Sequence, residues 1–138
     1  MRVFLDCDVL LDVALDRKPF AAASGKLLDH LETGQDSAAM AWHSISNLYY
    51  IAAKLSDDQT ARAMIADLCG LVHVVATGDQ EVMLALDWPM KDFEDALQCA
   101  AALQYQADCI VTRNLPDYEE CPIPAMTPDQ FIERHLTA

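Results

Sequence analysis

The sequence predicts one α/β domain over residues 1–138, built on a mostly parallel sheet. Short runs of strand-forming residues alternate with longer segments in which apolar residues recur at helical spacing. The connections between successive strands are long enough for the crossovers that parallel pairing requires. With 138 residues, of which 53% are hydrophobic, the chain can bury a substantial core. This pattern does not specify the order of the strands.

Two strands and three helices are expected in the first half of the chain. Val3–Leu5 and Ser37–Ala41 are short runs of apolar or small residues, as in buried strands. The helices are predicted from their apolar periodicity, and they cover Phe20–Leu31, Ser44–Leu55 and the segment from Asp57 or Asp58 to Leu68. A proline in the first turn, acidic caps and following glycines mark the helix ends.

Three strands and three helices are expected in the second half. Leu71–Val75 has the strongest strand pattern, Asp108–Thr112 is a further strand, and Ile123–Met126 is predicted at the edge of the sheet. The helices are expected from Thr77 to about Leu86, from Asp92 to Gln106, and from Pro128 onward.

The chain is strongly acidic, with a formal net charge of −13 and a pI near 4.3. Broad nucleic-acid binding is disfavoured, because it depends on Lys and Arg neutralising phosphates. Any nucleic-acid role must therefore be local and metal-assisted. No basic region precedes the first apolar run, and Asp6 and Asp8 interrupt it, so neither a signal peptide nor a membrane helix is expected. We expect a cytoplasmic protein that does not associate with membranes.

The cysteines, histidines and serines do not form an evident reactive site. The five cysteines are an odd number without CxxC spacing, which favours small core residues in a reducing compartment. The four histidines lack the spacing of metal ligands, and Ser44 and Ser46 have no neighbouring base motif.

Acidic residues gather at three places that a parallel sheet would bring to one edge. Asp6 and Asp8 follow the first strand, Asp92 and Asp95 open a helix, and Asp117 lies shortly after the strand that ends at Thr112. Ligand sites in open α/β sheets lie at the carboxyl ends of the strands. Clustered oxygen ligands suit Mg²⁺ or Mn²⁺, which assist phosphoryl transfer. A purely structural alternative is that Asp92 caps the helix, which requires no metal.

Several blocks of the sequence resemble the PIN-domain family, and more narrowly the toxin ribonucleases of bacterial toxin–antitoxin pairs. In chain order the blocks are FLDCDVLLD, RKPF, SISNLYY, DFEDALQCAAA, ADCIVTRNLPDY and PIPAMTPDQFI. The resemblance runs over essentially the whole chain, and DFEDA and TRN are its most specific parts. It implies a three-layer α/β/α sandwich around a parallel sheet, a divalent metal and an RNA substrate. It also implies a small antitoxin partner and a homodimer.

The resemblance assigns Asp6 as the first catalytic acid and Asp95 as the acid of the DFEDA block. Two positions depart from the family pattern. Asn47 stands where many members have a glutamate, and Asn114 stands where many have an aspartate, with Asp117 as a substitute three residues later. Asparagine offers a carbonyl ligand but no negative charge to hold a cation.

Three hypotheses follow for the function. The first is an endoribonuclease that uses Mg²⁺ or Mn²⁺, in which Asp6, Asp95 and Asp117 hold the metal and act in catalysis. Residues around them would complete the site, with Thr112 hydrogen-bonding inside it and Arg113 or Lys91 meeting the phosphate; the others are Asp8, Asn47, Asp92 and Asn114. The second is a phosphatase, because LDCDV also resembles the haloacid-dehalogenase motif, with Asp6 as nucleophile and Asp8 as acid/base. The third is an interaction module whose site has been lost.

Overall fold

The computed structural model describes residues 1–136, and in this range it contains five strands. They are Arg2–Leu5 (β1), Ser37–Ala41 (β2), His73–Val75 (β3), Cys109–Val111 (β4) and Ala125–Met126 (β5). All four strand pairings are parallel, and the order across the sheet is β3-β2-β1-β4-β5. The predicted parallel sheet is therefore confirmed, and β1 is its central strand.

Seven α-helices and one short 3₁₀-helix connect the strands within residues 1–136. The α-helices are Cys7–Ala14 (α1), Ala21–Glu32 (α2), Trp42–Leu55 (α3), Asp58–Cys69 (α4), Asp79–Asp87 (α5), Phe93–Tyr105 (α6) and Pro128–His135 (α7). The 3₁₀-helix is Leu115–Tyr118 (η1). Thr127 caps α7 and bonds reciprocally with Gln130, as a capping box. None of these helices combines the length and apolar character that a bilayer span requires.

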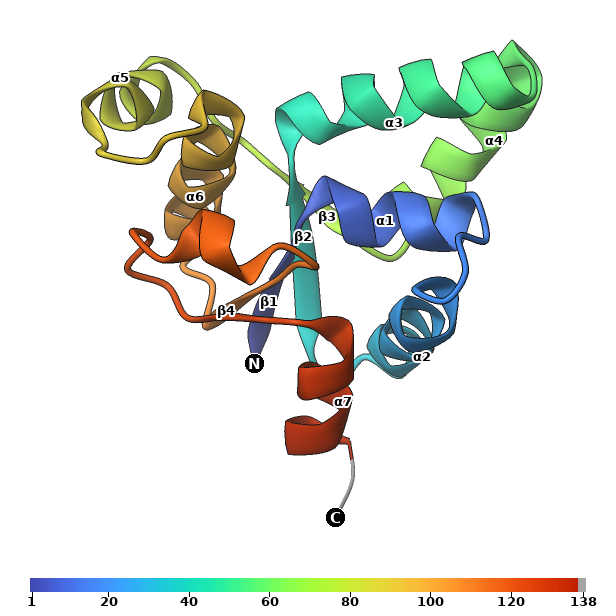
Figure 1. Cartoon of the computed structure of the whole chain (residues 1–138). Coiled ribbons are helices and arrows are strands. Elements are labelled where there is room, and N and C mark those ends of the chain that lie inside the picture. Colours follow the sequence, from blue (N-terminus) through green and yellow to red (C-terminus); the bar gives the residue numbers. More distant parts are fainter. Residues whose placement is uncertain (137–138) are drawn as a thin grey trace.

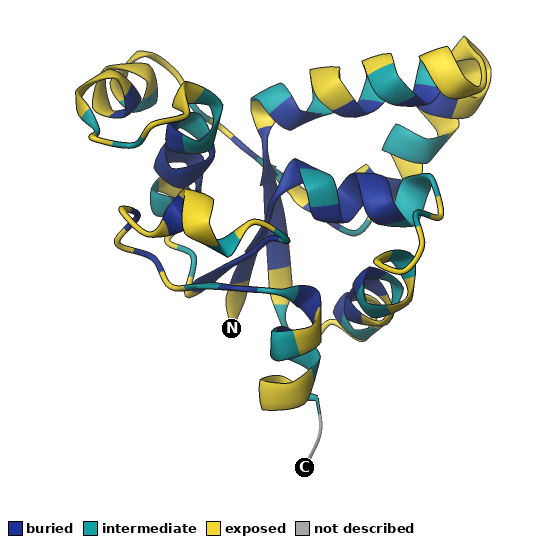
Figure 2. Ribbon diagram, viewed as in Figure 1, coloured by how far each residue is buried: buried dark blue, intermediate teal, exposed yellow. Residues whose placement is uncertain are grey.

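Helices cover both faces of the sheet, which gives the three-layer sandwich (Figure 1). The helices α1, α2 and α4 lie on one side and α5 and α6 on the other. Side chains alternate along β1, so Val3 and Leu5 face one layer while Phe4 faces the other. Figure 2 shows the buried residues concentrated in the strands and on the inward surfaces of the helices.

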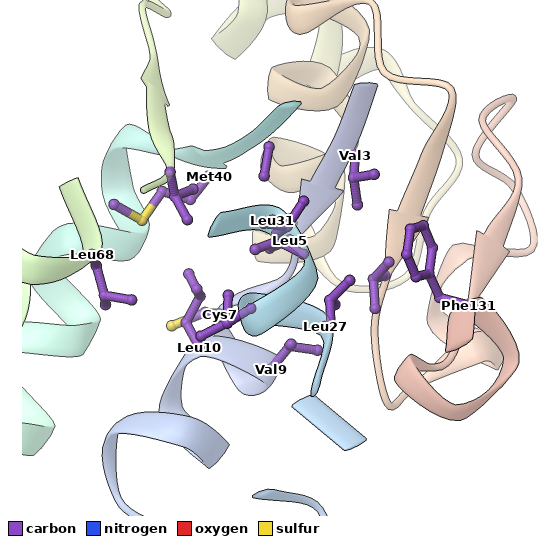
Figure 3. Close-up of a cluster of buried hydrophobic side chains, with 14 of the residues drawn as sticks. Val3, Leu5, Cys7, Val9, Leu10, Leu27, Leu31, Met40, Leu68 and Phe131 are labelled. Atoms are coloured by element: carbon purple, nitrogen blue, oxygen red, sulfur yellow. The ribbon is translucent and has the colours of Figure 1, made fainter. Parts of the chain in front are cut away.

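The larger core lies between the sheet and the layer that contains α1, α2 and α7. Figure 3 shows Val3 and Leu5 of β1 among leucines of α1 and α2, with Phe131 of α7 at one end. These four elements meet because each contributes buried apolar side chains to the same core. Helix α1 thus packs its apolar side on the sheet directly after β1 has ended. Its first residues therefore lie at the carboxyl end of the central strand.

The structure corrects several local predictions. The helix α1 was not predicted, although Val9, Leu10 and Val13 have helical spacing. Strand β3 begins two residues later than expected, because the Leu71 and Val72 backbone N–H groups still bond to Leu68 at the end of α4. Helix α5 follows Gly78 rather than Thr77.

The prediction that all five cysteines are free is wrong. Cys99 on α6 and Cys121 after η1 form a disulfide across a sequence separation of 22. The chain after η1 folds back onto α6 and brings them together, which sequence spacing does not reveal. Cys7 and Cys109 are buried free thiols, as expected, whereas Cys69 is exposed.

Candidate active site

The candidate site lies where the strand order reverses, at the carboxyl ends of β1 and β4. From β1 the chain proceeds outward through β2 and β3, and it then returns to β4 on the other side of β1. The crevice at such a switch point is the usual ligand site of open α/β sheets. Asp6 directly follows β1 and Thr112 directly follows β4, and the Asp6 backbone N–H donates to the Val111 carbonyl at 3.0 Å.

Asp6 is held inside this edge of the sheet by two hydroxyl groups. Its Oδ2 accepts hydrogen bonds from Thr112 Oγ1 and from the Tyr118 hydroxyl, each at 2.9 Å, and the residue is only 6% exposed. Burial raises the pKa of Asp6, although both hydrogen bonds oppose that shift. The two hydroxyls therefore fix the orientation of a buried carboxyl group. A nearby cation would stabilise its negative charge.

Asp8 lies beside Asp6, on the first turn of α1. Its Oδ2 accepts hydrogen bonds from the Arg113 backbone N–H (3.3 Å) and from Asn114 Nδ2 (2.9 Å). Burial and the charge of Asp6 raise the pKa of Asp8 to about 7. Asn114, expected among the residues that complete the site, is thus bonded to Asp8 through its amide nitrogen.

A second acidic group sits at the start of α6. Asp92 caps this helix by accepting a hydrogen bond from the Asp95 backbone N–H at 3.1 Å, which confirms the capping role considered for it. The same start also gathers charge, because one carboxylate oxygen from each of Asp92, Glu94 and Asp95 lies within 4.8 Å of the others. The first turn of α6 is therefore both capped by Asp92 and rich in negative charge.

A cleft of about 350 Å³ runs between the start of α6 and η1. Asp92, Asp95 and Asp117 line it together with Lys91, so the structure brings the predicted acids Asp95 and Asp117 to one cavity. Burial, and then the charges of Asp92, Glu94, Asp117 and Asp6, raise the pKa of Asp95 to about 7. Asp6 and Asp117 therefore both act electrostatically on Asp95, although they come from β1 and η1.

Arg113 and Asn47 are among the predicted residues that do not line this cleft. The Arg113 guanidinium is paired with Asp12, with Nε 2.7 Å from Oδ2, and it stacks on the Phe20 ring at 4.0 Å. Lys91 is then the cation at the cleft. Asn47 is exposed, one turn further along α3 than the buried Ser44.

Sequence reasoning missed three residues around the site. Tyr118 gave no signal beyond its aromatic character, and only the fold of η1 turns its hydroxyl toward Asp6. Asp12 interrupts an apolar run, and its complete burial could have been inferred from that setting. Glu94 lies between Asp92 and Asp95, but only Asp95 was predicted to hold the metal, and Asp92 was predicted to support the site.

The donor set fits a hard divalent cation. Carboxylate oxygens dominate the site, and such ligands suit Mg²⁺ and Mn²⁺. Two of these oxygens, Asp8 Oδ1 and Glu94 Oε2, are buried and accept no hydrogen bond. A buried acceptor without a hydrogen-bond donor destabilises the folded protein, so a cation bound to these two oxygens would remove that cost.

Comparison with known proteins identifies the family of this chain. The family model described as "PIN domain" matches residues 2–116. The chain belongs to the PIN-domain family. No curated protein matches this PIN domain.

Solved structures of toxin–antitoxin proteins share the fold of this PIN domain. A chain of VapBC2 from Rickettsia felis, bound to a promoter DNA fragment, has a TM-score of 0.72 at 12% identity, with 92% of this chain and 98% of that chain covered. VapBC-1 from nontypeable Haemophilus influenzae has a TM-score of 0.70 at 16% identity, with 94% of this chain and 99% of that chain covered. VapC20 of Mycobacterium tuberculosis, a sarcin–ricin loop cleaving toxin, has a TM-score of 0.61 at 13% identity, with 78% of this chain and 86% of that chain covered.

The acid cluster predicts how the stability of the metal-free PIN domain depends on pH. The pKa values of Asp8 and Asp95 are about 7 in the folded protein, against an ordinary value of 3.8. Between these values the folded state binds more protons than the unfolded state, so stability falls as the pH rises from about 4 to 7. We expect the melting temperature measured in chelator to decrease across this range.

The control for this pH dependence is Asp95→Asn, which should flatten the decrease. The carboxyls with a lowered pKa, namely Asp36, Asp57 and Asp58, titrate below the window and do not mask the effect. A melting temperature that rises steadily between pH 5 and 7 would contradict the raised pKa values.

Proposed function

We propose that this chain is a divalent-metal-dependent endoribonuclease and the toxin of a toxin–antitoxin pair. The observation that carries the proposal is that Asp95 of α6 and Asp117 of η1 line one cleft, while Asp6, which follows β1 at the switch point of the sheet, acts electrostatically on Asp95. Family membership supports the nuclease chemistry, and the toxin–antitoxin complexes among the structural neighbours support the biological role.

Each acid has a separate task in the proposed site. Asp6, oriented by Thr112 and Tyr118, is the deepest ligand, while Asp95 and Asp117 hold the ion from the two walls of the cleft. Bound Mg²⁺ or Mn²⁺ supplies a water molecule of lowered pKa and neutralises charge on the phosphate. Like charges gathered in one place repel each other, and this favours binding of a dication.

The remaining residues support the acids or meet the RNA. Asp8 is fixed by Asn114 and by the Arg113 backbone, so it acts from beside Asp6 rather than from the cleft. Lys91 provides a positive charge at the cleft for a phosphate of the substrate. A cation at this one place is consistent with an otherwise acidic protein, which cannot bind RNA along its whole surface.

The proposed partners are a small antitoxin and a second copy of the chain, in the cytoplasm. A largely apolar cavity of about 490 Å³ lies between α1, α2 and α4, with Asp29, Glu32 and Asp67 among its lining residues. Its composition suits an apolar segment that carries basic residues. For a second copy, exposed apolar side chains on α3 and α5 offer a surface; they are Trp42, Val82, Met83 and Leu86.

The test of the activity is cleavage of a mixed cellular RNA pool. We expect fragments with Mg²⁺ or Mn²⁺ and none with EDTA, because the proposed mechanism relies on the metal to lower the pKa of the attacking water and to neutralise charge on the phosphate. Restoring the metal after chelation should restore cleavage. Cleavage that persists at full rate in EDTA would refute the metal-dependent mechanism, and a complete lack of cleavage with either metal would favour the interaction module.

A further inference from the structure

The helix after the second strand lacks the acid that the family resemblance places there. The sequence of α3, WHSISNLYYIAAKL, contains no aspartate or glutamate. Asn47, at the family's glutamate position, is exposed and lies one turn beyond the residues of α3 that contact α6. If the metal site needs another carboxylate on this side, it must come from a different element.

Glu94 on the first turn of α6 is placed to provide that carboxylate. One of its oxygens lies within 4.8 Å of oxygens of Asp92 and Asp95. Glu94 therefore lies beside the predicted ligand Asp95, and 41% of its side chain is exposed, although Oε2 itself is buried.

The two oxygens of Glu94 have different surroundings. Oε1 accepts a hydrogen bond at 3.2 Å from Gln98 Nε2, which also donates to Ser44 Oγ at 3.1 Å. Gln98 and Ser44 are fully buried, so this network fixes the carboxylate between α3 and α6. Oε2 is buried and accepts no hydrogen bond, and His43 Nε2 is 3.8 Å away, beyond hydrogen-bond distance.

We infer that Glu94 is a metal ligand and that it replaces, from α6, the carboxylate missing at Asn47 of α3. This inference rests on the proposed metal-dependent function. The network of Ser44 and Gln98 orients the ligand through Oε1 and leaves Oε2 available to the ion. The competing explanation is that Glu94 only anchors α6 to α3.

Calorimetric titration of the metal-free protein with Mn²⁺ distinguishes the two explanations. Glu94→Gln keeps an oxygen that can accept from Gln98, but it removes the charge. We expect Mn²⁺ binding to weaken at least about tenfold, while the circular dichroism spectrum stays unchanged. Asp87→Asn, which removes an exposed carboxylate from the neighbouring α5, is the matched control and should change the affinity less than about twofold.

A second pair of variants tests the replacement itself. Asn47→Glu should leave the Mn²⁺ affinity nearly unchanged, and the double variant Glu94→Gln/Asn47→Glu should bind as weakly as Glu94→Gln. Full recovery of affinity in the double variant would assign the ligand position to residue 47 and overturn the inference. If the parent binds Mn²⁺ and Glu94→Gln binds it equally well, Glu94 is only an anchor. If the parent binds no Mn²⁺, the proposed function fails as well.

Discussion

Asp6→Asn and Asp95→Asn will each reduce RNA cleavage to the level of a reaction without enzyme. Both changes nearly preserve the shape of the side chain, but they remove the charge that holds a hard cation. A neutral amide cannot hold the cation with comparable affinity, because the site also needs the charges of its other acids. The measurement is the rate of fragment formation from a mixed RNA pool with Mn²⁺, on protein of the same concentration and purity.

The fold of these variants is checked by melting in chelator. Asp6 and Asp95 both have pKa values raised by burial, so removing either charge should leave the metal-free protein as stable as before, or slightly more stable. Asp8→Asn is the informative comparison, because Asp8 lies beside the cleft and its loss should reduce the rate less. A dehalogenase-type phosphatase would instead lose its general acid. Unchanged RNA cleavage by both Asp6→Asn and Asp95→Asn would refute the nuclease assignment.

Arg113→Met should destabilise the protein by about 3 kcal/mol, because it leaves the Asp12 carboxylate buried without its partner. Asp12 is completely buried, and its ion pair joins α1 to the segment after β4. We take the lower end of the range for broken buried pairs, since the Arg113 side chain is 25% exposed and water screens part of the interaction. Urea denaturation of the metal-free protein measures the effect.

The matched control for this prediction is Arg62→Met. Arg62 pairs with Asp58 on the surface of α4, where both side chains are largely exposed. Such a pair contributes little to stability, because water and salt screen it. The double variant Asp12→Asn/Arg113→Met should recover part of the stability, since it removes the buried charge. Equal losses in Arg113→Met and Arg62→Met would show that the Asp12 pair is not a buried one in solution.

The sequence was sufficient to predict the elements whose local signals agree with their packing. Ser37–Ala41 is a strand with the predicted bounds, and Asp92 caps the helix it was expected to cap. The α1 helix was missed because Asp6 and Asp8 looked like the polar end of a strand. The sheet order and the Cys99–Cys121 pairing depend on how distant segments pack, so neither has a local signal.

The candidate site was predictable where an acid follows a strand or opens a helix. Asp6, Asp95 and Asp117 were predicted in this way; the structure places Asp95 and Asp117 along one cleft and Asp6 at the end of β1. The hydrogen bonds that orient these acids were harder to predict from the sequence. Thr112 was expected in the site, but Tyr118 and Gln98 act through the three-dimensional positions of η1 and α6, which no spacing in the sequence encodes.

The central position of β1 also sets when the site can form during synthesis. As the chain leaves the ribosome, β1 can pair with β2, but its other edge stays open until β4 has been made. The Thr112 hydroxyl that orients Asp6 is 106 positions away in the chain, and Tyr118 follows later still. Long-range parallel pairing of this kind is slow, because a large loop must close first. A nascent chain therefore carries the first acid of the site for most of its synthesis without the groups that orient it.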